Sequence, residues 1–362
     1  MTQIYLIRHA EAEGNLYRIA QGQDNSNLTD RGWRQVQALE RRFKEIPVDA
    51  VYASDLYRTC ATASAIYLPK HLPLRRERAL REINLGVWER RSWGEVYRRW
   101  PEEMEHFSHR PDLWHLEGAE DPRAARARVL EVIRRIAADH TDQTVAVFTH
   151  GYVLRLVLSY LQGLDLDELD GIRTGDNTAV SLIEAEGERL RVVFRDDNSH
   201  LKTPEFLAEE RAVKRFSGLE GGLWFTSVRL PGQVEEISAL AAACRTSGVP
   251  FDRQALLADD DGGELLAGYL QEELTGLVRV APATGWISLL CIRPDRRRQG
   301  LGVQLLGQAV QRVRAAGGQV LRAAVPADPG TEAFFDACGF RPAPDGGELE
   351  KSIAFRPEFL SE

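Results

Sequence analysis

Residues 4–15 read IYLIRHAEAEGN, an apolar run that ends in the pair Arg8-His9 and is followed by Asn15. The short apolar run predicts a buried strand. The guanidinium group of Arg8 has the fork geometry that binds a phosphate through two parallel hydrogen bonds. The imidazole of His9 can attack phosphorus as a covalent nucleophile. A strand that ends in this pair therefore indicates a phosphoryl-transfer site beyond the carboxyl end of the strand.

Three further motifs follow in the first half of the chain. They read SDLYRTCATA (residues 54–63), LREINLGVWE (80–89) and VAVFTHG (145–151). In the first motif, Ser54 is a predicted helix N-cap and Arg58 falls in the first turns of that helix. The second motif contains Glu82. The third predicts a buried strand that ends in His150 and Gly151.

With these motifs in this order, residues 1–201 resemble the histidine phosphatase superfamily, whose fold is also called phosphoglycerate-mutase-like. One departure is Ala10, where the family more often has glycine. The resemblance implies a metal-independent reaction on a phosphomonoester, with a small phosphorylated metabolite as the substrate. Shorter signatures of the family agree with it: they are QG at 21–22, LTDRG at 28–32 with Gln35, EGAE at 117–120, Asn177 and NSHL at 198–201.

The same resemblance implies a role for each candidate residue. His9 would attack phosphorus and become phosphohistidine, and Glu82 would protonate the departing alkoxide and then activate water. The other site residues would bind the phosphate oxygens, as magnesium does in other phosphoryl-transfer enzymes: they are Arg8, Asn15, Gln21, Arg58 and His150.

A phosphoglycerate mutase is the alternative within the same family. The segment between Glu82 and His150 is compact for a mutase. The string LGVWE at 85–89 is more typical of the phosphatase branch. Both activities remain open at this point, and hydrolysis is the preferred interpretation.

Length and composition bound the other possibilities. The chain has 362 residues, which suits two domains better than one core. With 43% hydrophobic and 28% charged residues, its composition is that of a globular protein. Acidic residues outnumber basic ones by 32 to 28 in residues 1–200 and by 22 to 18 in residues 201–362. Neither half is therefore a basic nucleic-acid-binding module.

The cysteines and the apolar runs bear on the cellular compartment. The four cysteines, at positions 60, 244, 291 and 338, form no C-x-x-C pair, so a disulfide framework is not expected and a reducing cytoplasm is predicted. A strand is predicted within four residues of the N-terminus, so we expect no signal peptide. Arg155 interrupts the longest apolar run, and no membrane span is expected.

Short apolar runs alternate with amphipathic stretches in the first half. This alternation predicts an α/β fold, a three-layer α/β/α domain with a mostly parallel sheet. Its active residues should gather beyond the carboxyl ends of the strands. The predicted strands are 3–7, 48–53 and 144–149, with a hairpin of 179–183 and 190–195, and the predicted helices are 30–44, one around Arg58, 123–138 and 152–161.

Residues 202–222 are charged and then contain several glycines, and we interpret them as a linker between domain 1–201 and domain 223–362. The second half predicts strands at 223–230, 264–271, 277–280 and 286–292, and a helix at 234–244. The last strand runs into RPDRRRQGLG at 293–302, and a helix then extends to residue 316, where two glycines end it.

The turn at 297–302 is a candidate pyrophosphate site. Gly300 and Gly302 let the backbone approach a ligand, and the free N–H groups of the first helical turn favour an anion. A dinucleotide site is disfavoured because no G-x-G-x-x-G opens the turn. A P-loop is disfavoured because no Gly-Lys-Ser/Thr follows.

With IRP at 292–294, RRQGLG at 297–302 and FFDACGF at 334–340, residues 223–356 resemble the GNAT acyltransferase superfamily. The resemblance implies an α+β domain with a mixed sheet, acetyl-CoA or another acyl-CoA as ligand, and N-acetyl transfer to a small amine. It places the pyrophosphate on the turn and the pantetheine along strand 289–292. The implied ligand-binding residues are Leu290, Ile292, Arg297, Arg298, Gln299, Gly300, Leu301, Gly302 and Phe335.

Two positions depart from that family. Phe335 stands where the family often has the tyrosine that protonates the leaving thiolate, and a phenyl ring has no acidic proton. Asp328 stands near a position that is often asparagine. The alternative for the second half is therefore a domain that only binds or senses acyl-CoA.

A histidine cluster and a cysteine receive structural interpretations. His106, His109 and His115 lie close together, but the aromatic residues between them favour a segment that covers the pocket rather than a metal site, and we predict no metal. Cys291 lies on an apolar strand and is predicted to be a core residue rather than a nucleophile.

Overall fold

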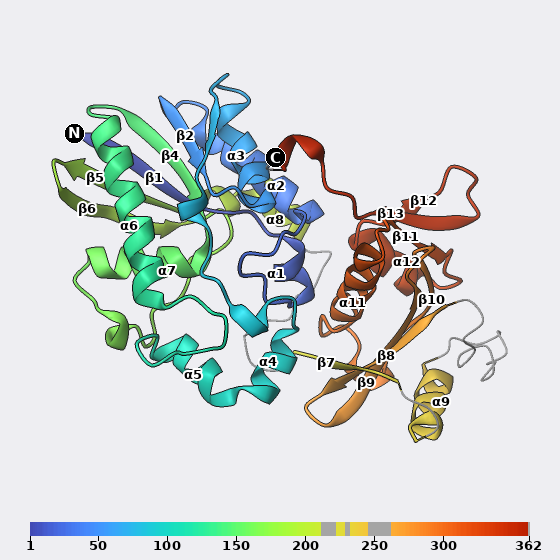
Figure 1. Cartoon of the computed structure of the whole chain (residues 1–362). Coiled ribbons are helices and arrows are strands. Elements are labelled where there is room, and N and C mark those ends of the chain that lie inside the picture. Colours follow the sequence, from blue (N-terminus) through green and yellow to red (C-terminus); the bar gives the residue numbers. More distant parts are fainter. Residues whose placement is uncertain (211–221, 229–231, 245–261, 361–362) are drawn as a thin grey trace.

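The computed structural model describes residues 1–210, 222–228, 232–244 and 262–360, which form two domains side by side (Figure 1). The N-terminal domain contains a six-stranded sheet in the order β3-β2-β4-β1-β5-β6. Pairing is parallel for β1 with β4 and for β2 with β3 and β4, and antiparallel for β5 and β6, which confirms the mostly parallel sheet. The strands are β1 (Thr2–Arg8), β2 (Ala50–Ala53), β3 (Leu74–Arg76), β4 (Thr144–Thr149), β5 (Val180–Glu186) and β6 (Arg189–Asp197).

Helices cover both faces of this sheet, as the α/β pattern predicts. Side chains alternate along a strand, so β1 sends Ile4 and Leu6 into one core and Ile7 into the other. The first core also holds α6 (Pro122–Asp139) and α7 (Gly151–Leu161), and the second holds α2 (Asp30–Phe43) and α3 (Tyr57–Tyr67). Two shorter helices, α4 (Trp93–Arg99) and α5 (Pro101–His109), pack at the edge of the first core.

The C-terminal domain contains a seven-stranded sheet in the order β12-β13-β11-β10-β9-β8-β7. Only β10 and β11 pair in parallel, so the sheet is mixed, as expected. Helix α9 (Val234–Ala243) packs on one face, and α11 (Gly302–Ala315) and α12 (Pro329–Ala337) pack on the other. The strands are β7 (Trp224–Ser227), β8 (Glu264–Leu270), β9 (Glu273–Ala281), β10 (Trp286–Ile292), β11 (Val320–Ala324), β12 (Arg341–Pro342) and β13 (Glu348–Ser352).

The two parallel strands of the second sheet diverge. β10 pairs with β11 only at Trp286 and Ile287, and its register against β9 shifts between Ile287 and Leu289. The rest of β10, up to Ile292, has no ladder partner on that side among the described residues. No strand therefore covers this edge, which leads to the start of α11, in the described part of the chain, and the Ile292 carbonyl oxygen accepts Nε of Arg297 at 3.2 Å.

Most predicted elements are confirmed, including the strands 144–149 and 286–292 at their predicted bounds. The strand predicted at 277–280 is longer, because a tight turn lets β9 pair with β8 from Glu273 onward. The predicted linker 202–222 begins with α8 (Pro204–Glu210), and its residues 211–221 lie outside the described part. The strand predicted at 223–230 is described over Trp224–Ser227, and residues 229–231 lie outside.

Each domain contributes residues to the other's core. Tyr17 and Ile19, in and after α1 (Glu13–Tyr17), belong to the core that α11 forms in the C-terminal domain. In the other direction, Phe355 and Phe359 from the C-terminal end pack against Tyr57 of the N-terminal domain. The domains therefore share an extensive interface.

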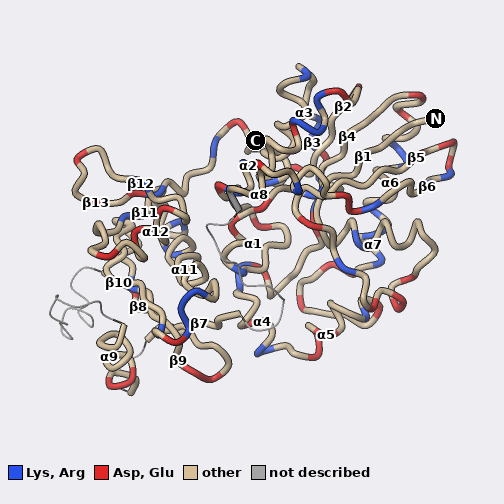
Figure 2. The backbone as a smooth tube through the Cα atoms, turned by 180° about the vertical axis from the view of Figure 1, so that it is seen from behind, with Lys and Arg blue, Asp and Glu red and all other residues tan. Residues whose placement is uncertain are grey.

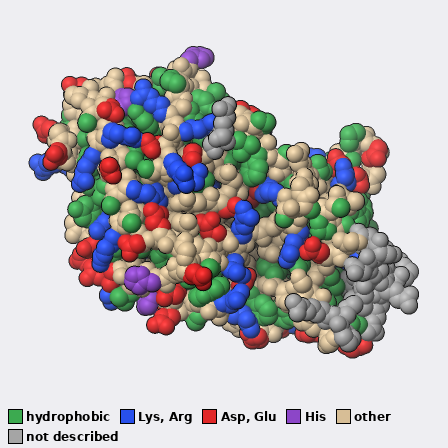
Figure 3. All heavy atoms as spheres, viewed as in Figure 1, with side chains coloured by type: hydrophobic (Ala, Val, Ile, Leu, Met, Phe, Trp, Pro, Cys, Tyr) green, Lys and Arg blue, Asp and Glu red, His purple; other side chains and the backbone are tan. Residues whose placement is uncertain are grey.

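Charges of both signs are spread over both domains (Figure 2). Acidic and basic side chains are also intermixed on the face shown in Figure 3. Within the described ranges, no helix combines the length and the apolar character needed to cross a membrane.

Candidate active site

The ends of two adjacent parallel strands bring the two predicted histidines together. Arg8 ends β1 and pairs in register with Thr149, the last residue of β4, so His9 and His150 follow at the same edge. Their ring centroids lie 5.3 Å apart, and both rings are buried. The sheet therefore joins two histidines that are 141 positions apart in the sequence.

His9 is held in one tautomer. Its Nδ1 lies 2.7 Å from the carbonyl oxygen of Ala10, so we assign the proton to Nδ1 and leave a lone pair on Nε2. Burial, and then the charges of Arg58 and Arg8, lower the pKa of His9 well below its usual value. The ring is therefore neutral at pH 7, as a nucleophile requires.

Both candidate arginines are anchored by backbone carbonyls. Arg58 is 1% exposed and donates to the carbonyl oxygens of Asp24 and Gly22, each at 2.8 Å. Arg8 donates to the carbonyl oxygen of Gly175. The Nε atoms of Arg8 and Arg58 are buried and have no hydrogen-bond partner among the described residues. Burial lowers the pKa of Arg58 to about 10, and the group stays charged at pH 7.

The side chain of His150 contacts the hydroxyl group of Ser54. Its Nε2 lies 2.9 Å from Ser54 Oγ, and its buried Nδ1 has no partner in the described chain. Burial, followed by the charge of Arg58, lowers the pKa of His150 well below its usual value. The prediction of Ser54 as an N-cap was wrong: α3 begins at Tyr57 with Leu56 at the cap, and Ser54 Oγ accepts the N–H of Leu56 at 3.3 Å besides its contact with His150.

The side chain of Glu82 contacts the N-terminus of α7. Its Oε1 accepts the N–H groups of Ile83 and Val153, and its Oε2 accepts that of Tyr152, each at 3.0 Å. The carboxylate thus satisfies free N–H groups of the helix N-terminus. Oε2 accepts one of these bonds and keeps a lone pair that could carry a proton, so its role as an acid stays a prediction.

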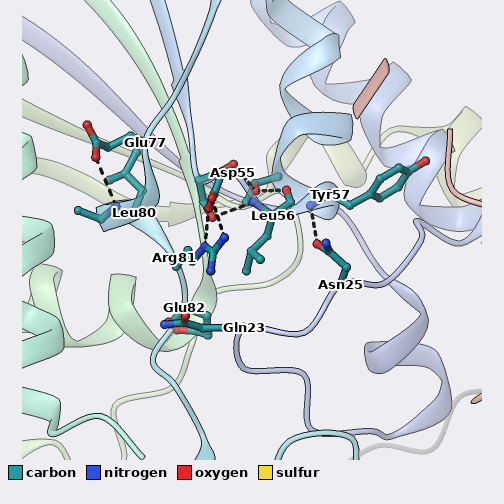
Figure 4. A network of polar contacts seen from close by, with 12 residues as sticks. Gln23, Asn25, Asp55, Leu56, Tyr57, Glu77, Leu80, Arg81 and Glu82 are labelled. Atoms are coloured by element: carbon teal, nitrogen blue, oxygen red, sulfur yellow. Dashed lines mark hydrogen bonds and ion pairs between the residues drawn. The ribbon is translucent and has the colours of Figure 1, made fainter. Parts of the chain in front are cut away.

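Polar contacts fix the backbone around Glu82 (Figure 4). Asp55 and Arg81 form a bidentate ion pair with two N–O distances of 2.6 Å, which ties the residue before Glu82 to the start of α3. Gln23 Nε2 donates to the Glu82 carbonyl oxygen at 3.1 Å. The guanidinium of Arg128 on α6 donates to the carbonyls of Ala79, Arg81 and Glu82. Sequence reasoning missed Arg128, since only the tertiary structure brings α6 to this loop.

Asn15 and Gln21 lie on the segment that follows β1. Asn15 Oδ1 accepts the N–H of Ala12 at 3.0 Å and Nδ2 of Asn177 at 3.4 Å, and Asn177 Nδ2 also donates to the His9 carbonyl at 3.0 Å. Gln21 accepts the hydroxyl proton of Ser26. Asn15 is therefore linked to the His9 carbonyl through Asn177, whereas Gln21 pairs with Ser26, and the contact of both residues with phosphate stays a prediction.

The predicted pyrophosphate turn leads from β10 into α11. Gly300 has φ +76°, a conformation that favours glycine, and α11 begins at Gly302 with Leu301 at the N-cap. Arg298 and Gln299 are exposed on the turn. Arg297 donates to the carbonyls of Ile292 at 3.2 Å and Cys244 at 3.0 Å, so it braces the turn against α9.

The remaining candidates flank this turn. Leu290 and Ile292 lie on the diverging part of β10. Phe335 is 6% exposed and packs edge-on against Phe334 and Phe340 in the core below α11. Asp328 is the N-cap of α12: its side chain accepts the N–H of Thr331 at 2.9 Å and so caps the first turn of that helix.

Comparison with known proteins identifies both halves. Residues 4–198 match the family model of the histidine phosphatase superfamily (branch 1), and residues 252–355 match that of the acetyltransferase (GNAT) domain. Phosphoserine phosphatase 1 of Hydrogenobacter thermophilus is 30% identical over 195 residues, which cover 54% of this chain and 92% of the relative.

Further similar proteins cover the same half. The metal-independent phosphoserine phosphatase of Arabidopsis thaliana is 31% identical over 214 residues, covering 57% of this chain and 86% of the relative. The solved structure of Bacillus stearothermophilus YhfR aligns with a TM-score of 0.54 at 31% identity, and the match covers 56% of this chain and 100% of that one.

Proposed function

Because the chain belongs to the histidine phosphatase superfamily and carries a GNAT acetyltransferase domain, we propose that its N-terminal domain hydrolyses phosphomonoesters through a phosphohistidine on His9. One observation carries this proposal: Nε of Arg8, Nε of Arg58 and Nδ1 of His150 are buried and have no hydrogen-bond partner among the residues that the structure describes. Buried polar atoms almost always have a partner. Three such nitrogens around a nucleophile suit the non-bridging oxygens of a phosphoryl group.

The first step uses the lone pair of His9 Nε2. It attacks phosphorus, the bond from phosphorus to the ester oxygen breaks, and the alkoxide leaves with a proton from Glu82. Arg8, Arg58 and His150 stabilise the charge on the equatorial oxygens, and no resident metal is required for this work. The carbonyls that anchor Arg58 hold its guanidinium in place before substrate arrives.

The second step returns the enzyme to its starting state. Glu82, now a carboxylate, takes a proton from water, and the resulting hydroxide attacks phosphohistidine and releases inorganic phosphate. Because α7 donates N–H groups to Glu82, the carboxylate is held in position for both steps. We place Asn15 and Gln21 in the phosphate-binding pocket.

The substrate is a small phosphorylated metabolite. Two similar proteins are named phosphoserine phosphatases, so O-phosphoserine is the first substrate to test, followed by sugar phosphates and phosphoglycerates.

His9→Ala should abolish hydrolysis, whereas His115→Ala, at an exposed histidine, should not. Wild-type protein quenched during turnover should carry acid-labile, base-stable phosphate on His9. Near-normal turnover by His9→Ala would rule out this mechanism. Isomerisation of phosphoglycerate without release of phosphate would favour the mutase alternative.

For the C-terminal domain we propose binding of acetyl-CoA or another acyl-CoA and N-acetyl transfer to a small amine. The glycine turn at 300, the start of α11 and the unpaired edge of β10 support this proposal, because together they offer backbone N–H groups and close access. Acyl-CoA would supply an activated thioester when bound. The residues that would hold it are Leu290, Ile292, Arg297, Arg298, Gln299, Gly300, Leu301, Gly302 and Phe335.

Binding and transfer can be tested separately. Gly300→Val should abolish acetyl-CoA binding in calorimetry, whereas Gly346→Val, which has a similar φ of +71°, controls for backbone strain. Phe335→Tyr should leave affinity nearly unchanged and raise acetyl transfer if thiolate protonation limits turnover. Binding by the wild type without transfer to any amine would favour the sensing alternative, and no binding at millimolar acetyl-CoA would overturn the assignment.

We also propose domain bounds of 1–201 and 223–362, joined by 202–222, and a cytoplasmic location. All four cysteines are free, which suits a reducing compartment.

A further inference from the structure

The segment that carries part of the phosphate pocket is buried in the other domain. Tyr17, at the end of α1, is 2% exposed, and Ile19 is 8% exposed, and both belong to the core around α11. Figures 1 and 2 both show α1 beside α11. One side of α1 therefore packs against residues that belong to the C-terminal domain.

A glycine in the middle of α11 makes this contact possible. A Cβ atom on Gly307 would lie 2.4 Å from Cβ and 2.7 Å from Cγ of Tyr17. Glycine weakens a helix interior, so its presence at this position requires another reason. The close approach of α1 to α11 is such a reason, and any side chain at 307 would push α1 away.

An ion pair at the end of α11 fixes α1 a second time. Arg314 donates to the Glu13 carboxylate, with Nη1–Oε2 at 3.0 Å and Nη2–Oε1 at 3.3 Å, and Nη2 also donates to the Ile353 carbonyl at 2.8 Å. Glu13 is 5% exposed, so water screens this pair little. Arg314 thus links α1, α11 and the strand end after β13.

The anchored segment holds the phosphate-binding residues. Asn15 lies on α1, two residues from both Glu13 and Tyr17. The chain then passes Gln21 and reaches Gly22 and Asp24, whose carbonyls orient the guanidinium of Arg58. A displacement of α1 would therefore reach both Asn15 and Arg58 through a short, continuous stretch of backbone.

The C-terminal tail supports the same site from another side. Phe355 and Phe359 pack edge-on against Tyr57, which precedes Arg58, with ring centroids at 5.0 and 5.8 Å. The Arg314 guanidinium lies over the Phe355 ring at 4.8 Å. The tail and α11 are thus joined where they contact the phosphatase domain.

We propose that the C-terminal domain positions the phosphate pocket of the N-terminal domain, with Gly307 and Arg314 as positioning residues that act through α1. This inference rests on the proposed function for the location of the pocket. On this proposal, phosphatase activity depends on the acetyltransferase domain of the same chain. That domain then supports the phosphatase active site structurally, besides any activity of its own.

Two arginines of the same helix provide a matched test in the full-length chain. Arg314→Ala removes the pair with Glu13, whereas Arg312→Ala removes a pair with Glu264 inside the C-terminal domain. We expect Arg314→Ala to raise the Kd for inorganic phosphate, and KM for p-nitrophenyl phosphate, at least tenfold. Arg312→Ala should change neither by more than twofold. Arg314→Lys should recover part of the loss, since an ammonium can pair with Glu13.

A second variant keeps the test decisive if Arg314→Ala does not fold. Gly307→Ala raises the intrinsic helix propensity of α11 but places a methyl group against Tyr17. It should weaken phosphate binding at least tenfold, while acetyl-CoA binding should be unchanged. Wild-type phosphate affinity in folded Gly307→Ala and Arg314→Ala would overturn the inference. Phosphate binding without hydrolysis by the wild type would refute the phosphatase assignment alone and leave this comparison valid. Failure of the wild type to bind phosphate would refute both.

Discussion

Gly151 and Arg8 lie so close together that no side chain fits between them. A Cβ atom on Gly151 would lie 3.0 Å from Nε and 3.1 Å from Cζ of Arg8, and 2.5 Å from Cγ2 of Thr174. The glycine that follows His150 therefore lets a guanidinium from the neighbouring strand lie against the start of α7. Nε of Arg8, for which the described part of the chain offers no hydrogen-bond partner, lies at this contact.

Gly151→Ala should displace the Arg8 guanidinium and lower kcat/KM for a phosphomonoester by about 10²-fold, the scale of loss from a misplacement of about 1 Å. Steady-state kinetics on p-nitrophenyl phosphate provide the measurement. Gly232→Ala is the matched control, because a Cβ there meets no atom of the described residues within 4 Å. Equal kinetics for the two alanine variants would show that the Arg8 position is not critical.

Arg58→Ala should lower kcat by about 10³-fold, as removal of other arginines that stabilise a transferring phosphoryl group does. Arg58→Lys should not restore the rate. A lysine ammonium is a point charge without the planar fork of the guanidinium, so it should not reproduce the contacts to Gly22 and Asp24 and donate to phosphate in the same geometry. Single-turnover rates of the two variants test this, and full rescue by lysine would argue against a geometric role of the guanidinium.

Glu82→Gln should slow hydrolysis most for substrates with poor leaving groups. An aryl phosphate needs little protonation of its leaving group, so its rate should fall much less than that of O-phosphoserine. Thermal unfolding of the variant must accompany the kinetics, since Glu82 also caps α7. Equal losses on both substrates would remove Glu82 from the role of general acid.

Stability should fall as the pH drops below about 6.5. Burial lowers the pKa of His9 and His150 well below their usual value, and that of His200 to about 4. Below pH 6.5 the unfolded chain binds protons that these folded histidines do not, so unfolding takes up as many as three protons. The free energy of unfolding should then decrease by about 4 kcal/mol per pH unit at most.

Urea unfolding at pH 7.5, 6.5 and 5.5 measures this dependence. His150→Asn should reduce the slope by about one third, and His115→Ala, at an exposed histidine, should leave it unchanged. A stability that is flat between pH 7.5 and 5.5 would show that the three histidines accept protons in the folded state.

The local sequence pattern predicted a strand, helix or turn correctly wherever the residues of that one element carry the pattern. The apolar runs before Arg8 and His150 predicted strands β1 and β4, and the glycines near 300 predicted a turn before a helix. Pattern failed at Ser54, because α3 starts only at Tyr57 and Ser54 Oγ accepts the N–H of Leu56 ahead of the helix. The same hydroxyl contacts His150, which lies 96 residues away, and no local pattern encodes that contact.

Local motifs and periodic stretches predicted the two families and the order of the elements, because each signal lies within a short segment of chain. They also singled out the candidate site residues, whose roles stay predictions. The tertiary structure fixed which nitrogens of His9 and Arg58 have partners, since the carbonyls of Ala10, Gly22 and Asp24 accept from them. It also decided that α1 is buried against α11. Tyr17 meets Gly307 across 290 residues of chain, and no local pattern encodes a contact that only the packing of two domains creates.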